Sequence, residues 1–294
     1  MSLFKLPSWL NQHLYTAKDF KDITEAELDD LKRRLSRFNV SNPDVSIVIP
    51  AWNEGNNIYR TLSSLASTTT SLKVELFVVN NNSTDHTQQV LDRLGVKNYF
   101  QPLQGTPYAR QLGLLQARGK YHLCADSDTF YPPRWIELMI KPMMNNNNIV
   151  GVYSRYCFVP PKGQLRIGLW GYERLTGVLI RLRKFKREHI NVLGFTMGFV
   201  TEIGKSTGGF EVTEVRKFDN ALGSDYFVEE AEDGRMAVNL KTVGSLKLVT
   251  HSQARPFTSS RRLSSEGGVL SSLIRRLKLH STRLGEYAAG PQVN

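Results

Sequence analysis

The sequence has few cysteines and no long apolar run, and each shortage excludes a class of protein. Two cysteines, Cys124 and Cys157, among 294 residues are too few for a disulfide framework or a zinc site. No apolar run reaches eighteen residues, so we expect no membrane-spanning helix. Residues 1–10 contain a proline and no long apolar stretch, so they do not resemble a secretory signal. We therefore expect a cytoplasmic protein with reduced core thiols.

Acidic residues are fewer than basic ones, which gives a net charge of +11. This balance fits nucleic acid, an anionic lipid surface or a phosphate-bearing substrate, and equally a solvated basic face without a partner. Nucleic-acid binding would also need basic residues interleaved with stacking aromatics on one face. The sequence lacks that pattern, so we expect no nucleic-acid partner.

Short apolar runs alternate with helical spacing across residues 45–125. Such alternation predicts an α/β fold with right-handed crossovers and a mainly parallel sheet. The helix over residues 85–94 has Asp85 and Gln88 spaced like a capping box and Gly95 at its end. The expected strands are 45–49, 74–79, 96–100 and 121–125, and the expected helices are 57–66, 85–94 and 108–117.

The segments on either side of this region predict three domains. Apolar spacing over residues 25–38 predicts a helix in an N-terminal arm, residues 1–43. The α/β domain would occupy residues 44–252, and residues 253–294 would be a basic amphipathic C-terminal extension. In the second half of the domain we expect strands at 149–159, 191–202 and 245–249, a basic helical stretch at 162–190 and a helix at 229–240.

Polar clusters follow three of the expected strands: residues 50–54, 80–85 and 126–128. Ligands of parallel sheets bind where the strands end, so these clusters should line one edge. The first two clusters also suit plain turns and helix caps. However, successive asparagines can face a base or a ribose. Arg110, near a helix N-terminus, suits a diphosphate, although a surface arginine fits equally well.

Asp126 and Asp128 directly follow a buried apolar run. Two carboxylates at this spacing on a turn can converge on Mg²⁺ or Mn²⁺, which proteins bind through one or two carboxylates plus substrate phosphates. The motif alone occurs by chance in a chain of this length. Its place after a buried strand favours a metal.

Four segments, in this order and at these spacings, resemble family 2 glycosyltransferases with the GT-A fold, a Rossmann-like, mainly parallel sheet with flanking helices. They are VSIVIPAWNE at 45–54, VVNNNSTD at 78–85, ARQLG at 109–113 and DSD at 126–128. The resemblance covers roughly residues 45–250. Four motifs in register are specific, whereas any one alone is not.

The resemblance implies a site for a nucleoside-diphosphate sugar, with uracil as the usual base. The second strand of the family commonly ends in aspartate, so Asn80 puts that base in question. The implied donor-binding residues are Pro50, Ala51, Asn53, Glu54, Asn80, Asn82, Arg110 and Asp126.

The resemblance also implies a metal, Mn²⁺ or Mg²⁺, bridging two phosphates. Asp128 and Asp126 would bind it, and His251 would be a third ligand. A solvated or capping histidine explains His251 equally well.

A Glu-Asp pair late in the family's domain matches Glu232 and Asp233. The resemblance implies that Asp233 is the general base, with Glu232 second in line. Four acids within five residues can also simply charge a helix start. A base facing the leaving group would give single displacement and inversion at the anomeric carbon.

The acceptor is expected to be a glycan or a lipid-linked molecule, in cell-surface polysaccharide or glycolipid synthesis. Basic residues at 181–187 and a basic amphipathic stretch at 269–279 suit peripheral contact with the inner face of an anionic membrane. A packing helix with a solvated face is the alternative. A sugar-nucleotide-binding protein without transferase activity would result if Glu232 and Asp233 lay away from the donor.

Overall fold

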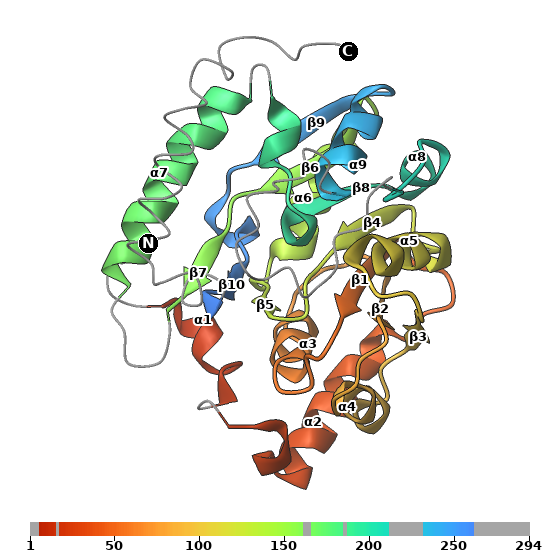
Figure 1. Cartoon of the computed structure of the whole chain (residues 1–294), viewed down its shortest axis with the longest axis vertical. Coiled ribbons are helices and arrows are strands. Elements are labelled where there is room, and N and C mark those ends of the chain that lie inside the picture. The colour runs from red at the N-terminus through yellow and green to blue at the C-terminus, as the bar shows by residue number, and fades with distance from the viewer. Residues whose placement is uncertain (1–5, 16–17, 161–165, 185–186, 212–231, 262–294) are drawn as a thin grey trace.

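The computed structural model describes residues 6–15, 18–160, 166–184, 187–211 and 232–261 (Figure 1). Its centre is a seven-stranded sheet with the order β3-β2-β1-β4-β8-β6-β9. All neighbouring strands are parallel except β8, which runs antiparallel to β4 and β6. The predicted mainly parallel α/β sheet is therefore confirmed. The strands are β1 (Val45–Ala51), β2 (Val74–Asn80), β3 (Asn98–Phe100), β4 (Tyr121–Cys124), β6 (Ile149–Ser154), β8 (Met197–Val200) and β9 (Ser245–Val249).

A second, three-stranded sheet has the order β5-β10-β7 and is made of β5 (Thr129–Phe130), β7 (Cys157–Val159) and β10 (Phe257–Ser259). β10 pairs with both neighbours, so the first residues of the predicted C-terminal extension belong to the fold. The domain boundary expected at residue 252 stays a prediction, although β10 lies beyond it. The single strand expected over residues 149–159 is likewise divided between the two sheets.

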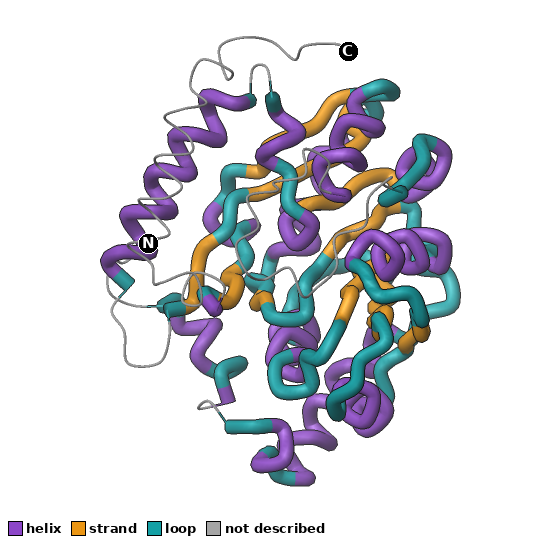
Figure 2. The backbone as a smooth tube through the Cα atoms, viewed as in Figure 1, coloured by secondary structure: helices purple, strands orange, loops and turns teal. Residues whose placement is uncertain are grey.

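Helices cover both faces of the main sheet (Figure 2). Val45, Ile47 and Ile49 of β1 point to one face, where they join a core with α3, α4, α6 and, outside these, α2. Val48 points to the other face and packs with α5. Helix α5 lies beside α8, and α8 lies beside α9. This alternation follows from the two-residue period of a strand. The helices are α1 (Ser8–Asn11), α2 (Glu25–Leu35), α3 (Ile58–Ala66), α4 (Thr87–Leu94), α5 (Thr106–Gln116), α6 (Trp135–Asn145), α7 (Ile167–Arg183), α8 (Thr201–Ser206) and α9 (Glu232–Lys241).

The N-terminal arm packs on both sheets. Leu10 of α1 lies with Phe130 and Phe257 in a small core on the three-stranded sheet, beside which Figure 1 shows α1. Leu28 and Leu31 of α2 belong to the main core. No helix within the described ranges has the length and apolarity needed to cross a membrane. The predicted amphipathic stretch at 269–279 lies outside the described residues.

The predicted capping box at α4 is absent. The helix begins at Thr87, so Asp85 lies one residue too early to cap it. Its carboxylate instead accepts hydrogen bonds from the backbone N–H groups of Thr87 (2.9 Å) and Gly55 (3.1 Å). Asp85 therefore ties the loop after β2 to the loop after β1. Gly95 ends α4 with φ 63°, as predicted.

Candidate active site

Asn53 joins the loops that follow β1 and β2. Its side-chain oxygen accepts hydrogen bonds from the backbone N–H groups of Thr84 (2.8 Å) and Asp85 (3.3 Å), and its own N–H donates to Ser83 Oγ (3.0 Å). Its φ of 53° is a left-handed conformation that asparagine tolerates. Nearby, Ala51 is buried and Pro50 is half-buried at the end of β1. These residues shape the wall that was predicted to face a nucleoside.

The three asparagines at the end of β2 and just after it all bond within the protein. Asn80 donates to Gln88 Oε1 (2.8 Å) and accepts from Ser83 N–H (3.0 Å). Asn81, the middle one of the successive asparagines, is buried and accepts from Gly105 N–H (2.9 Å). Asn82 donates to the Pro102 carbonyl (3.3 Å). A nucleoside contact from Asn80 or Asn82 stays a prediction, and their observed role is to fix this edge.

Asp126 and Asp128 lie on a rigid turn after β4. Thr61 of α3 holds the turn: its Oγ1 donates to the Ser127 carbonyl (2.8 Å) and accepts from Thr129 N–H (3.1 Å). Asp126 N–H donates to the hydroxyl of the buried Tyr131 (2.9 Å). The two carboxylate side chains keep 31% and 26% of their surface exposed. The turn therefore fixes both aspartates while leaving their carboxylates accessible to a ligand.

Arg110 connects this turn to the Glu-Asp pair. Its Nη2 lies 2.8 Å from Asp126 Oδ1, and its Nε lies 3.5 Å from Glu232 Oε1. The side chain is only 6% exposed, and a Cβ on Gly194 would lie 2.1 Å from Nη2. The guanidinium predicted to reach the nucleotide is thus paired with carboxylates of the protein. It brings together two acidic groups that are more than 100 residues apart.

Asp233, in the first turn of α9, is held by two backbone N–H groups. Gly194 donates to Oδ2 (2.9 Å) and Gly234 to Oδ1 (2.8 Å). Loss of water contact and the neighbouring Glu232 raise the pKa of Asp233 to about 6, against the opposing effects of Arg110 and the two N–H groups. A carboxylate with a pKa near neutrality is suited to general-base catalysis.

Arg261, which the sequence did not single out, contacts two of the predicted donor-site residues. Its Nη2 donates to Glu54 Oε1 (2.8 Å) and to Asp128 Oδ2 (3.1 Å). Glu54 also accepts from Asn57 Nδ2 (2.7 Å). Burial raises the pKa of Glu54, an effect that Arg261 opposes and Asp128 reinforces. The only sequence signal was the arginine-rich character of the chain after the last predicted strand.

Asp126 and Asp128 fit a divalent cation that is held jointly by a protein and by phosphates. Among the described residues, no three His, Cys, Asp or Glu side chains gather as a preformed metal site. His251 caps a short 3₁₀ helix (Ser252–Ala254), and its Nδ1 accepts from Gln253 N–H (3.1 Å). A nitrogen that accepts this bond has no lone pair left for a metal. The role of His251 as a third ligand stays a prediction, and Nδ1 could serve only if it gave up this bond.

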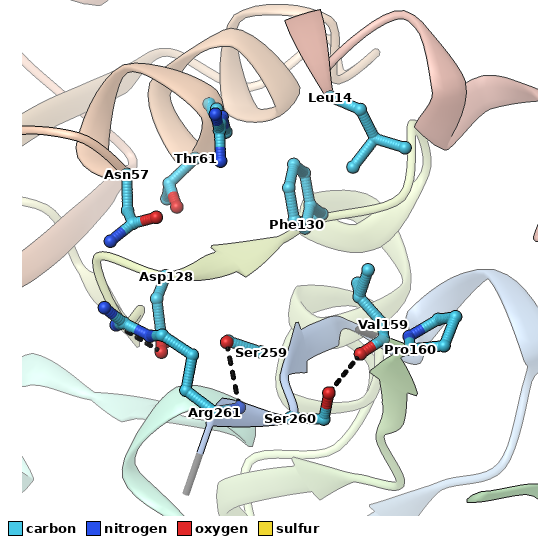
Figure 3. A pocket seen from close by; sticks show the side chains of 11 residues that line it. Leu14, Asn57, Thr61, Asp128, Phe130, Val159, Pro160, Ser259, Ser260 and Arg261 are labelled. Atoms are coloured by element: carbon cyan, nitrogen blue, oxygen red, sulfur yellow. Dashed lines mark hydrogen bonds and ion pairs between the residues drawn. The ribbon is translucent and has the colours of Figure 1, made fainter. Parts of the chain in front are cut away.

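A cavity of about 400 Å³ lies beside Asp128 (Figure 3). It shares Asp128 with the predicted donor site but extends toward the three-stranded sheet and α1. Its lining includes Leu14, Phe130, Val159 and Pro160 on an apolar side and Asn57, Asp128, Ser260 and Arg261 on a polar side.

Solved structures share this architecture. A mannosyltransferase from Pyrobaculum calidifontis, in complex with GDP-Man and Mn²⁺, aligns with a TM-score of 0.53 and 18% identity over 85% of this chain and 66% of that one. Glucosyl-3-phosphoglycerate synthase from Mycobacterium tuberculosis, in complex with Mn²⁺, UDP-glucose and phosphoglyceric acid, aligns with a TM-score of 0.50 and 19% identity over 92% and 86%. The chain has the GT-A fold that these glycosyltransferases share.

Sequence comparison identifies the family. The family model described as glycosyl transferase family 2 matches residues 46–203, more than half of the chain. The chain belongs to glycosyl transferase family 2. The hyaluronan synthase of Pasteurella multocida is 29% identical over 228 residues, which are 73% of this chain and 22% of that protein. The chain thus spans about a fifth of the length of this relative.

Proposed function

We propose that the chain transfers a hexosyl or related sugar from a nucleoside-diphosphate sugar to an acceptor hydroxyl, with inversion and with a divalent metal. One observation carries the proposal. Arg110 contacts both Asp126, on the predicted donor side, and Glu232, next to the predicted base Asp233. Donor chemistry and base chemistry therefore share one site.

The donor half of the site is built from Asp126 and Asp128. These carboxylates would hold Mn²⁺ or Mg²⁺, which supplies positive charge against the diphosphate that leaves. Arg110 holds Asp126 in place through the ion pair between Nη2 and Oδ1. Glu54, Asn53 and the asparagines of the second loop would form the wall around the nucleoside.

The base half is Asp233, with Glu232 as the second candidate. The carboxylate takes the proton of the acceptor hydroxyl as the hydroxyl attacks the anomeric carbon, and the bond to the diphosphate breaks on the opposite side. Attack and departure on opposite faces give inversion. The backbone N–H groups of Gly194 and Gly234 fix the carboxylate for this step.

For the substrates, we propose a UDP-sugar donor and a glycan or lipid-linked acceptor. The family 2 assignment, the name of the hyaluronan synthase relative and the UDP-glucose of one structural neighbour support this choice. The GDP-Man of the other neighbour makes guanine the base to compare. The acceptor would belong to polysaccharide or glycolipid synthesis.

We further propose a place at the cytoplasmic face of an anionic membrane. Val178 and Leu182 of α7 are more than half exposed, and Arg181 and Arg183 lie in the same last turns. Exposed apolar side chains next to arginines suit an interfacial helix. Flotation with anionic liposomes should exceed flotation with neutral ones, and equal flotation would remove this part of the proposal.

The donor is tested by thermal shift with a panel of UDP- and GDP-sugars, with and without Mn²⁺. We expect a UDP-sugar to raise the melting temperature only when the metal is present. Asp128→Ala should abolish that shift, because its carboxylate is the proposed metal ligand. A shift that persists in Asp128→Ala would contradict the proposed donor site. Slow release of UDP from the bound sugar would distinguish an enzyme from a protein that only binds.

A further inference from the structure

Arg261 lies at the meeting point of three segments that are distant in sequence. It lies two residues after β10, and its Nη2 reaches Glu54 after β1 and Asp128 after β4. One nitrogen thus donates to both carboxylates. Glu54 is only 15% exposed, and the nearby guanidinium offsets part of the cost of burying its charge.

Arg261 uses the same carboxylate that the donor's cation would use. Two positive groups repel each other, and a guanidinium on Asp128 Oδ2 therefore competes with a divalent ion for that oxygen. The pair is a modest obstacle because Arg261 is 54% exposed, and exposed pairs are weak. A divalent ion that arrives with a diphosphate can displace the guanidinium.

The structure has room for the displaced side chain. Arg261 lines the cavity beside Asp128 together with Ser259, Ser260 and Asn57 (Figure 3). The guanidinium can turn away from Asp128 without unpacking a core residue. Arginine also matches phosphate oxygens with two parallel N–H groups, so a diphosphate next to Asp128 is a natural new partner.

We propose that Arg261 is a donor-binding residue that rests on Glu54 and Asp128 and moves onto the diphosphate when a divalent cation takes Asp128. The proposal rests on the proposed function, because it needs a nucleoside diphosphate and a cation at this edge. It assigns Arg261 two opposite effects: it weakens binding of the metal alone and strengthens binding of the nucleotide with the metal.

Calorimetry on the full chain tests both effects with Arg261→Gln, using MnCl₂ alone and then UDP at saturating Mn²⁺. Arg134→Gln is the matched control, because Arg134 is also about half exposed and pairs with a carboxylate, Glu137, away from the site. We expect Arg261→Gln to bind Mn²⁺ about threefold more tightly. We expect it to bind UDP with Mn²⁺ about tenfold more weakly. The control should match the wild-type protein in both titrations.

Opposite signs in the two titrations support the proposal. Tighter binding of both Mn²⁺ and UDP would mean that Arg261 only obstructs the site. Weaker binding of both would mean that Arg261 does not compete with the metal. No change in either would exclude any role, and each of these three results overturns the proposal. Asp128→Asn distinguishes failure of the proposed donor site from failure of the role of Arg261. If this variant keeps wild-type affinity for Mn²⁺ and UDP, the donor site itself is misplaced. If it loses both while Arg261→Gln changes neither, only the role of Arg261 fails.

Discussion

The two ends of the central sheet each pair an acid with an arginine, with opposite results. At the end where the strands begin, Glu75 accepts from Ser46 Oγ (2.6 Å), Arg118 N–H (2.9 Å) and Arg118 Nη2 (2.7 Å). These bonds outweigh burial and lower the pKa of Glu75. At the other end, loss of water contact and Glu232 raise the pKa of Asp233 despite Arg110.

The arginines differ in the same way. Arg118 is half exposed and its remaining N–H groups reach the carbonyls of Val40 and Ser41. Arg110 is buried, and its Nη1 has no hydrogen-bond partner among the described residues. Buried polar groups are usually satisfied, so an exception marks a place where stability is not the main constraint. In the proposed function, the first end stabilises the fold and the second carries the chemistry.

The largest expected effect comes from the acid with the raised pKa. Asp233→Asn keeps the shape and can keep one of the two backbone contacts, because its amide nitrogen cannot accept a hydrogen bond, and it removes the proton acceptor. We expect sugar transfer to fall by about 10²–10⁴-fold, measured as nucleotide release with acceptor present. Binding of the donor with Mn²⁺ should stay near the wild-type value.

Glu232→Gln is the control for Asp233→Asn, because it changes the neighbouring acid. A fall in transfer much larger in Glu232→Gln than in Asp233→Asn would move the base to Glu232. Transfer retained in both variants would remove the pair from the mechanism.

The sequence was sufficient for the sheet but not for the contacts of its edge. Continuous apolar runs predict strands because a strand covered on both faces buries every side chain. The runs at 45–49 and 74–79 lie in β1 and β2. The resemblance predicted Asp126 and Asp233 near one edge, and Arg110 contacts Asp126 and Glu232, the residue before Asp233. The hydrogen-bond partner of a single side chain leaves no such pattern in the sequence. Asn80 bonds to Gln88 in the protein, and nothing in the spacing indicated this.

Arg261 shows the same limit most clearly. It lies 133 residues from Asp128 and 207 from Glu54, and it follows a short strand that has no apolar run of its own. β10 exists because β5 and β7 offer it partners on both sides. Pairing of this kind is decided by tertiary structure and could not be read from local pattern.

Gly119 and Gly194 lie at the two ends of the central sheet, and each is closely packed. A Cβ on Gly119 would lie 2.6 Å from the backbone N of Ser46, whereas one on Gly194 would meet the end of the Arg110 side chain. Backbone of a central strand cannot move aside, so Gly119→Ala should lower the free energy of unfolding by about 3 kcal/mol. Gly194→Ala should lower it less but reduce transfer more, because it displaces Arg110. Urea unfolding and a transfer assay on both variants check this, and equal effects on transfer would contradict it.

The charge of Glu75 should matter for stability alone. Glu75→Gln keeps the size of the side chain but removes charged hydrogen bonds from Arg118 and Ser46. We expect a loss of about 2 kcal/mol in the free energy of unfolding, with transfer by the folded protein unchanged. Arg134→Gln, which removes half of an exposed pair, should lose less than Glu75→Gln in the same urea experiment. A fall in transfer for Glu75→Gln would break the division between the two ends.

The smallest expected effect is on the pH dependence of stability, to which the two ends of the sheet contribute with opposite sign. The pKa of Asp233 is raised to about 6, so its base form is lost as the pH falls, and transfer should drop about tenfold per unit below that value. The same raised pKa favours the folded state at low pH, an advantage that is lost as the pH rises through about 6. Glu75, with a lowered pKa, stabilises the fold above its ordinary range and loses this effect as the pH falls. Asp233→Asn should therefore gain stability over the wild-type protein in urea more at about pH 8 than at about pH 5. A gain that is equal at both values, together with a flat rate profile across pH 6, would show that Asp233 does not titrate in this site.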